Sequence, residues 1–269
     1  MALWFAALLG VVQGLTEFLP ISSTAHIRIM VALFGYSDKG MAAYTAVIQL
    51  GTLLAVLIYF AKDLAGVSVA MFREPGTPEG RLPWLLAAGT VPIVIAGLLL
   101  KKHIEGDLRS LYVIAIALIV VGIAMAVIDK LYGGGEGKRP LAEITYTDAI
   151  LVGLAQTLAL VPGVSRSGAT ICMILILGFT RSDAARFSFL LSIPAIAGAG
   201  IFEAKDAFTH LGREAIPALA VGITTAAITG YISIAWIIKW LGSHDLIGFA
   251  IYRIVAGLAL LGGLFTRLL

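Results

Sequence analysis

The sequence predicts an all-α polytopic membrane protein, and three observations carry this prediction. Hydrophobic residues make up 59% of the 269 residues and charged residues only 13%, whereas a typical soluble domain carries roughly 25% charged residues. The apolar runs are continuous, while the strands of a membrane β-barrel alternate between apolar and polar residues. A polar motif also occurs twice within otherwise apolar sequence. The chain is therefore expected to form helices in a bilayer around a polar site.

About six stretches are predicted to cross the membrane, because a spanning helix needs about 20 mostly apolar residues. Five of them carry no charged residue, and the last carries only Arg253. The six stretches are 41–61, 82–100, 110–128, 187–202, 215–238 and 246–264.

Two further apolar segments, 1–19 and 149–161, are each ended by a break and followed by a short apolar arm. The breaks are Pro20 and Pro162-Gly163. This pattern predicts two re-entrant helical hairpins, over about 1–35 and 147–180. Irregular backbone at membrane depth is tolerated only where it is buried in protein or lines a wet cavity. Paired broken segments in two halves of a chain point to a central binding site.

The two hairpin segments are related by an internal repeat. Polar or glycine residues recur at an offset of 143, in the pairs Gly10 and Gly153, Gln13 and Gln156, Ser22 and Ser165, Thr24 and Ser167. We expect a first half over 1–132, a glycine-rich linker over 133–144 and a second half over 145–269, together forming one membrane domain. Because three spans are an odd number, the second half would enter from the opposite side, as an inverted-topology repeat. The alternative to an internal repeat is that these matches arose by chance.

The first motif places ionisable groups where they are costly. A carboxylate (Glu17) and an imidazole (His26) at membrane depth indicate a functional site. Gln13 and Glu17 are four residues apart and would share one helix face, as would Ser22 and His26. A helix that starts after Pro20 would direct free backbone N–H groups and its positive end at the break, which favours an anion.

The second motif repeats this arrangement after the break at Pro162-Gly163. Gly163 would let the backbone approach a ligand closely. Ser165 and Ser167 lie at the expected helix start, and Arg166 carries a guanidinium fork that matches phosphate oxygens. Together, these hydroxyls, the guanidinium, the imidazole and the carboxylate form a set of groups suited to phosphoryl transfer.

The segments GVVQGLTEFLPISSTAH (10–26) and PGVSRSGAT (162–170) resemble the undecaprenyl-diphosphatase family, the bacitracin-resistance type of membrane phosphatase. The similarity extends to FSFLLSIP (187–194) and to the pair Tyr252-Arg253. The resemblance implies removal of the terminal phosphate from undecaprenyl diphosphate, which recycles the lipid carrier of cell-wall synthesis. It also implies a divalent cation, a bacterial plasma-membrane location and a site open to the extracytoplasmic side. Members often have glutamate where this chain has Gln13, which weakens a two-carboxylate metal site.

From the residues and the resemblance together we predict roles for individual side chains. Glu17, Ser23, His26 and Arg166 are the candidate catalytic residues. The candidate ligands of a divalent cation, Mg²⁺ or Ca²⁺, are Glu17 and Gln13. The candidate phosphate-binding residues are Ser22, Thr24, Ser165, Ser167, Gly163, Arg253 and Gln49. Arg253, a charge inside a span, should pair with a carboxylate or with substrate phosphate.

Several alternatives remain open at this point. Ser23 is favoured as the nucleophile, with His26 and Glu17 handling the proton; a phosphohistidine at His26 is the rival. Ser165 and Ser167 could only cap a helix, and Gln49 could only bond across helices. A transporter or lipid-phosphate flippase is the alternative function. The expected partners are membrane lipid and a polyprenyl diphosphate rather than nucleic acid, and a homodimer is left open.

Overall fold

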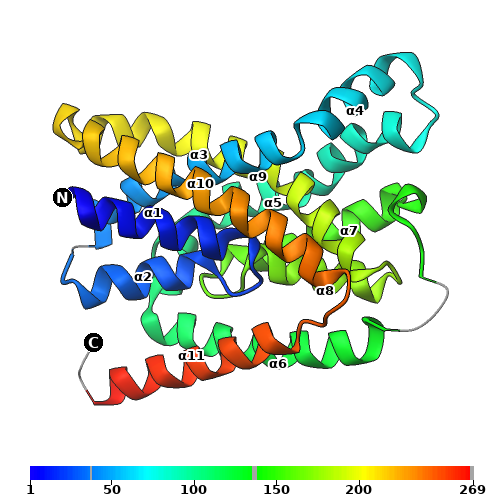
Figure 1. The fold of residues 1–269 in the computed structure, drawn as a ribbon. Helices are drawn as coiled ribbons and strands as arrows, with labels where there is room; N and C mark the ends of the chain where they lie inside the picture. Colours follow the sequence, from blue (N-terminus) through cyan, green and yellow to red (C-terminus); the bar gives the residue numbers. More distant parts are fainter. Residues whose placement is uncertain (37, 135–137, 267–269) are drawn as a thin grey trace.

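The fold is a bundle of α-helices (Figure 1). The computed structural model describes the backbone of residues 1–36, 38–134 and 138–266. The α-helices in these ranges are α1 (Leu3–Phe18), α2 (Ser23–Leu33), α3 (Asp38–Tyr59), α4 (Ala61–Arg73), α5 (Pro78–Glu105), α6 (Leu111–Tyr132), α7 (Tyr146–Thr157), α8 (Arg166–Ile176), α9 (Arg181–Leu211), α10 (Ile216–Leu241) and α11 (Ile247–Phe265). Short 3-10 helices are η1 (Asp107–Arg109), η2 (Leu141–Glu143), η3 (Leu158–Leu160) and η4 (Arg213–Ala215).

The chain is a multi-pass membrane protein. Within the described residues, 5 helices are long and apolar enough to cross a membrane, namely α3, α5, α6, α10 and α11. The stretch 187–202, expected as a sixth span, lies inside the 31-residue helix α9. The arms of both predicted hairpins are shorter apolar helices. Large apolar side chains such as Leu98 and Leu99 point outward, as expected for a surface that contacts lipid acyl chains.

The helices repeat with the spacing found in the sequence. Their first residues pair at an offset of 143, as Leu3 and Tyr146, Ser23 and Arg166, and Asp38 and Arg181. The second arm of each hairpin ends at a glycine with positive φ, Gly35 (67°) and Gly178 (90°). Such a glycine is a common way to end a helix, because it has no Cβ to clash. The repeat therefore extends from single residues to whole elements.

Figure 1 shows that corresponding helices of the two halves run in opposite directions. Helix α6, the last helix of the first half, ends at the right, whereas α11 runs beside it and ends at the left. Each hairpin packs against a long helix of the other half, α1 against α10 and α7 against α5. This exchange interlocks the halves and brings the two breaks to the middle of the bundle.

Repeated glycines allow this exchange of helices. A Cβ added to Gly10 of α1 would lie 2.0 Å from Thr225 Oγ1 of α10. A Cβ added to its counterpart, Gly153 of α7, would lie 2.2 Å from the carbonyl oxygen of Gly89 in α5. Small residues let helix backbones approach closely in membranes. The glycine pair of the repeat therefore serves helix packing.

Helix α8 lies inside the bundle, among the largest cluster of buried apolar side chains. Eight of its 11 residues are buried, and they include Ile171, Ile174 and Leu175. An irregular break next to a short helix would be costly if it faced lipid. Burial of α8 removes that cost.

The two halves differ at α4, because at the repeat offset of 143 its positions 61–73 correspond to 204–216, where α9 continues to Leu211. Helix α4 follows α3 directly, has no buried residue, and was not expected as a separate helix. In the second half, the described chain has only η4 between α9 and α10.

Candidate active site

Both breaks end with a serine in the same unusual conformation. Ser22 has φ 75° and Ser165 has φ 74°, and they are the only non-glycine residues with positive φ in the described chain. Each caps the helix that follows: Ser22 Oγ accepts from Ala25 N at 3.4 Å, and Ser165 Oγ accepts from Gly168 N at 3.2 Å. Positive φ at a non-glycine residue is sparsely populated and occurs preferentially at functional sites. Helices α2 and α8 therefore begin with matching serine caps.

Glu17 joins the two hairpins. Its Oε1 accepts a hydrogen bond from Arg166 Nη2 at 2.8 Å, and the two residues are 149 positions apart. Its Oε2 accepts from Ser23 Oγ at 2.6 Å and from Gln13 Nε2 at 2.8 Å. The carboxylate is buried, and these three donors compensate for its loss of water. The spacing of Gln13 and Glu17 on one helix face is as predicted.

A cavity of about 270 Å³ opens beside this carboxylate. Eight of the predicted site residues line it, from both hairpins and from α3: Glu17, Ser22, Ser23, Thr24, Gln49, Gly163, Ser165 and Arg166. Arg166 Nη1 is buried and has no hydrogen-bond partner. An unpaired buried donor is costly, so this atom is suited to a phosphate oxygen inside the cavity. Arg109, at the end of η1, also lines the cavity and was not predicted as a site residue.

His26 is turned toward α11. Its Nε2 lies 2.6 Å from the hydroxyl of Tyr252, and its Nδ1 lies 2.8 Å from the carbonyl oxygen of Ser22. The His26 and Tyr252 rings stack at a centroid distance of 5.6 Å. The hydroxyl of Ser23 is instead bonded to Glu17. The base next to the predicted nucleophile is therefore Glu17 in this geometry. The role of Tyr252 could not be read from its position in an apolar span.

Arg253 lies behind both breaks and is fully buried. Its Nη1 donates to the carbonyl oxygen of Pro20 at 3.0 Å. Its Nη2 donates to the carbonyl oxygens of Gly163 at 2.7 Å and Val164 at 3.0 Å. We expected a carboxylate or substrate phosphate as its partner, and the structure corrects this: the guanidinium binds backbone carbonyls of both hairpins. The irregular backbone at the breaks offers free carbonyls, a feature that residue spacing does not reveal.

Ser167 and Gly163 also act in packing. Ser167 Oγ donates to the carbonyl oxygen of Leu19 at 3.1 Å, so it ties α8 to the first hairpin. Gly163 has φ 99°, and an added Cβ would lie 2.7 Å from the carbonyl oxygen of Ile114. Gly163 lines the cavity, as expected, and its lack of a side chain also lets α6 approach its backbone closely.

Comparison with known proteins identifies the family. A family model described as bacitracin resistance protein BacA matches residues 6–259. The chain belongs to this family. Three relatives that it resembles are each named undecaprenyl-diphosphatase. They come from Myxococcus xanthus strain DK1622 (51% identity, 97% of this chain and 89% of the relative), Chlorobium phaeobacteroides strain BS1 (48%, 97% and 97%) and Nocardioides sp. strain ATCC BAA-499 / JS614 (46%, 95% and 94%).

In this BacA-family chain the oxygen donors suit a cation only in part. Within the described residues, no group of three or more His, Cys, Asp or Glu side chains could hold a metal ion. Glu17 and Gln13 are adjacent, with Gln13 Nε2 2.8 Å from Glu17 Oε2. Mg²⁺ typically keeps several waters and binds one or two carboxylates plus substrate phosphates. The pair therefore fits a cation bound mainly by substrate oxygens and does not fit an all-protein cage.

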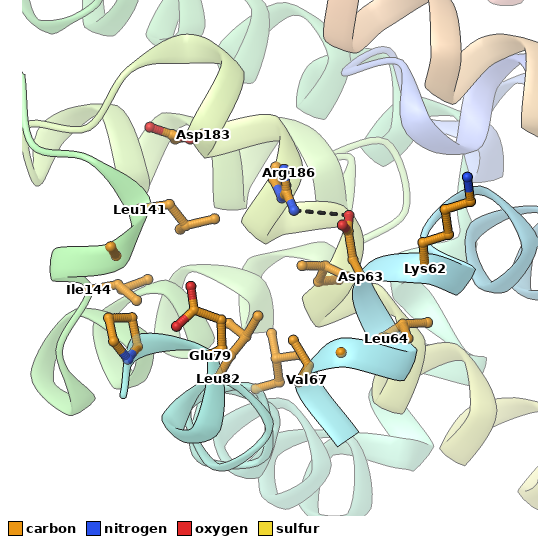
Figure 2. Close-up of a pocket in the computed structure, with 15 residues that line it drawn as sticks. Lys62, Asp63, Leu64, Val67, Glu79, Leu82, Leu141, Ile144, Asp183 and Arg186 are labelled. Atoms are coloured by element: carbon orange, nitrogen blue, oxygen red, sulfur yellow. Dashed lines mark hydrogen bonds and ion pairs between the residues drawn. The ribbon is translucent and has the colours of Figure 1, made fainter. Parts of the chain in front are cut away.

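A larger cavity, of about 440 Å³, lies elsewhere, between α4, α5, η2 and α9. Figure 2 shows its charged side chains, with an ion pair at 2.9 Å between Arg186 Nη2 and Asp63 Oδ2. None of the predicted site residues of this BacA-family chain lines it. Residues of α4 line this larger cavity, whereas the smaller cavity contains the reactive groups.

Proposed function

We propose that this chain is an integral membrane phosphatase that hydrolyses undecaprenyl diphosphate to undecaprenyl phosphate and inorganic phosphate. The proposal rests on one arrangement: Ser23 and Arg166, from different halves, both bond to the carboxylate of Glu17 beside a cavity. The names of its relatives in the BacA family support the same activity. The product would return to cell-wall synthesis as the lipid carrier.

The proposed reaction uses Ser23 as the nucleophile. Its Oγ attacks the terminal phosphorus, and its proton passes to Glu17 Oε2, which lies 2.6 Å away. The bond between the terminal phosphorus and the bridging oxygen breaks, and undecaprenyl phosphate leaves with both bonding electrons. Glu17 gives up this proton to the departing undecaprenyl phosphate. A water molecule then attacks the phosphoserine and gives a proton to the Glu17 carboxylate, the bond between phosphorus and Ser23 Oγ breaks, and Glu17 passes that proton to Ser23 Oγ. Such proton transfer contributes about 10²- to 10⁴-fold to the rate.

The charge of the terminal phosphate would be held by fixed donors. Arg166 lines the same cavity as Ser23, and its Nη1 has no hydrogen-bond partner. The N-termini of α2 and α8 add backbone N–H groups and the positive ends of two helix dipoles. Preorganised donors of this kind stabilise the transferring phosphoryl group without reorganisation.

We also propose that the enzyme uses a divalent cation, Mg²⁺ or Ca²⁺. Glu17 and Gln13 would hold it together with substrate oxygens. When bound, it would offset part of the negative charge of the diphosphate. Calorimetric titration of Mg²⁺ in the presence of inorganic pyrophosphate tests this, since Gln13→Ala should weaken cation binding. Equal binding by the variant and the parent would contradict the role of Gln13.

We propose the bacterial plasma membrane as the location, with the site open to the extracytoplasmic side, and a homodimer as the assembly. Exposed apolar residues on the spanning helices support a bilayer environment, in which the polyprenyl chain would also lie. Accessibility of single cysteines placed in the loop at Gly76 or at Gly242 to a membrane-impermeant reagent tests the orientation. Mass measurement in nanodiscs tests the dimer.

The deciding experiment is phosphate release from a polyprenyl diphosphate by the purified protein. Wild-type protein should release one phosphate per substrate, whereas Glu17→Ala and Arg166→Ala should lose most turnover. Full turnover in either variant would refute the assignment.

A second candidate, a lipid-phosphate transporter or flippase, draws on the opposite directions of the two halves. Inverted repeats with broken helices are typical of alternating-access transporters. A transporter does not need a hydroxyl bonded to a base, as Ser23 is to Glu17. Movement of a fluorescent lipid phosphate across liposomes without hydrolysis would favour this function.

A further inference from the structure

A second, smaller cavity of about 60 Å³, here called the side chamber, adjoins the reaction cavity. Four residues line both spaces and mark their junction: Thr24, Gln49, Arg109 and Pro162. The chamber itself is lined by polar side chains from α1 and α3, including Gln13 and Thr45, and by Arg28 of α2.

The charges of the described lining residues differ between the two spaces. In the reaction cavity the ionisable residues are Glu17, Arg109 and Arg166. Glu17 and Arg166 neutralise each other in an ion pair at 2.8 Å, so Arg109 supplies the net positive charge. In the chamber the ionisable lining residues that the structure describes are Arg28 and Arg109, with no carboxylate. A diphosphate needs more positive charge than the Glu17–Arg166 pair provides.

Arg109 is held in place through its backbone. Its carbonyl oxygen accepts a hydrogen bond from Arg28 Nη2 at 2.7 Å, which fixes η1 against α2. Its guanidinium makes no hydrogen bond or ion pair within the part of the chain that the structure describes. The side chain is half-buried, so its donors are available at the junction of the two spaces.

Gln13, which lines the chamber, also affects its charge. Its amide carries no charge, whereas a carboxylate lining the chamber would repel an anion. The amide of Gln13 removes that repulsion while it keeps its bond to Glu17. The neutral amide of Gln13 and the guanidinium of Arg109 both favour an anion in the chamber.

We propose that Arg109, with Gln49 and Thr24, forms a second phosphate subsite next to the reacting one. It binds either the phosphate that stays on the lipid or the inorganic phosphate after its release; the chemistry of recognition is the same. This inference rests on the proposed function, because it assigns the second phosphate group of that substrate. Arg109 would act on affinity rather than on the chemical step.

The test compares Arg109→Gln and Arg109→Lys with the parent protein. Losing one charge-assisted hydrogen bond should raise KM for the polyprenyl diphosphate about tenfold in Arg109→Gln. The value of kcat should stay within about threefold, because binding lost equally from substrate and transition state appears in KM. Arg109→Lys keeps the charge but not the fork, so it should recover part of the affinity. Arg186→Gln, which removes a paired arginine at the other cavity, is the matched control and should leave KM unchanged.

Inhibition constants separate the two sources of phosphate. If the subsite holds the lipid phosphate, Arg109→Gln should weaken inhibition by a polyprenyl monophosphate and leave orthophosphate inhibition unchanged. If it holds the released product, the orthophosphate constant should change instead. Unchanged KM and unchanged inhibition by both compounds would overturn the proposal.

A binding measurement keeps the subsite separate from the reaction. Calorimetric titration of inorganic pyrophosphate should show weaker binding to Arg109→Gln than to the parent, whether or not the parent hydrolyses lipid diphosphate. An inactive parent with this affinity difference would refute the phosphatase assignment and retain the subsite. Equal affinities in an active parent would refute the subsite alone. Arg109→Lys, the milder change, serves as the second variant if Arg109→Gln does not fold.

Discussion

Arg166 Nη2 lies 2.8 Å from Glu17 Oε1, although 149 positions separate the two residues in the chain. Each residue lies in a different hairpin, and each hairpin packs against a long helix of the other half. The pair is therefore both a link between the halves and a part of the candidate active site. The pair forms only when the two halves pack together. Variants of it can therefore change both turnover and stability, and the two should be measured separately.

Replacing the carboxylate of Glu17 should reduce turnover with little loss of substrate affinity. Glu17→Gln keeps the shape of the side chain but removes the base that bonds Ser23, so kcat should fall about 10²- to 10⁴-fold. Steady-state phosphate release measures this. Asp63→Asn is the matched control, because Asp63 also pairs with an arginine, at 2.9 Å, but at the other cavity. A kcat reduced less than tenfold in Glu17→Gln would show that another group accepts the proton.

The nucleophile can be identified by trapping the phosphorylated enzyme. Brief mixing with substrate labelled in the terminal phosphate should leave acid-stable label on Ser23, because a phosphoserine resists acid. Ser23→Ala should carry no label and have no turnover. Acid-labile label that disappears in His26→Ala would instead identify a phosphohistidine and contradict our assignment.

Arg253 should stabilise the backbone of both breaks. Arg253→Met leaves the carbonyl groups of Pro20 and Gly163 without their donor, so the protein should lose about 3 kcal/mol or more of stability. Thermal melting in detergent measures the loss, and phosphate release below the melting point should also fall because both breaks shift. Arg181→Met is the comparison: it removes the ion-pair partner of the buried Asp129, at the start of α9 rather than at the breaks. It should lower the melting temperature without lowering turnover of the folded protein.

The glycine packing between α1 and α10 should be sensitive to a single methyl group. A Cβ at Gly14 would lie 2.0 Å from Thr229 Oγ1 and 2.6 Å from the carbonyl oxygen of Ala226. Gly14→Ala should therefore destabilise the protein by about 1–3 kcal/mol, as overpacking typically does. Gly198→Ala is the control, since no atom lies within 4 Å of its added Cβ. Alanine should be neutral or slightly stabilising there. Equal melting temperatures for the two variants would contradict the close approach of α1 and α10.

Much of the fold follows from local sequence. Apolar runs of membrane-spanning length predict helices wherever they occur, and prolines predict the two breaks. The helix starts at Ser23 and Arg166 keep the repeat offset, because caps and breaks are properties of a few adjacent residues. Helix α4 was missed because its mixed composition resembles a loop.

The sequence by itself determined the membrane fold class, the two broken hairpins and the residue types that gather at them. Only the tertiary structure decided which atoms meet. Ser23 contacts Glu17 rather than His26, and Arg253 contacts backbone carbonyls. Arg109 lines the cavity from η1, the short helix that connects α5 to α6. The physical reason is that side-chain partners depend on how the halves cross, and that crossing is set by close packing of distant helices rather than by any local pattern.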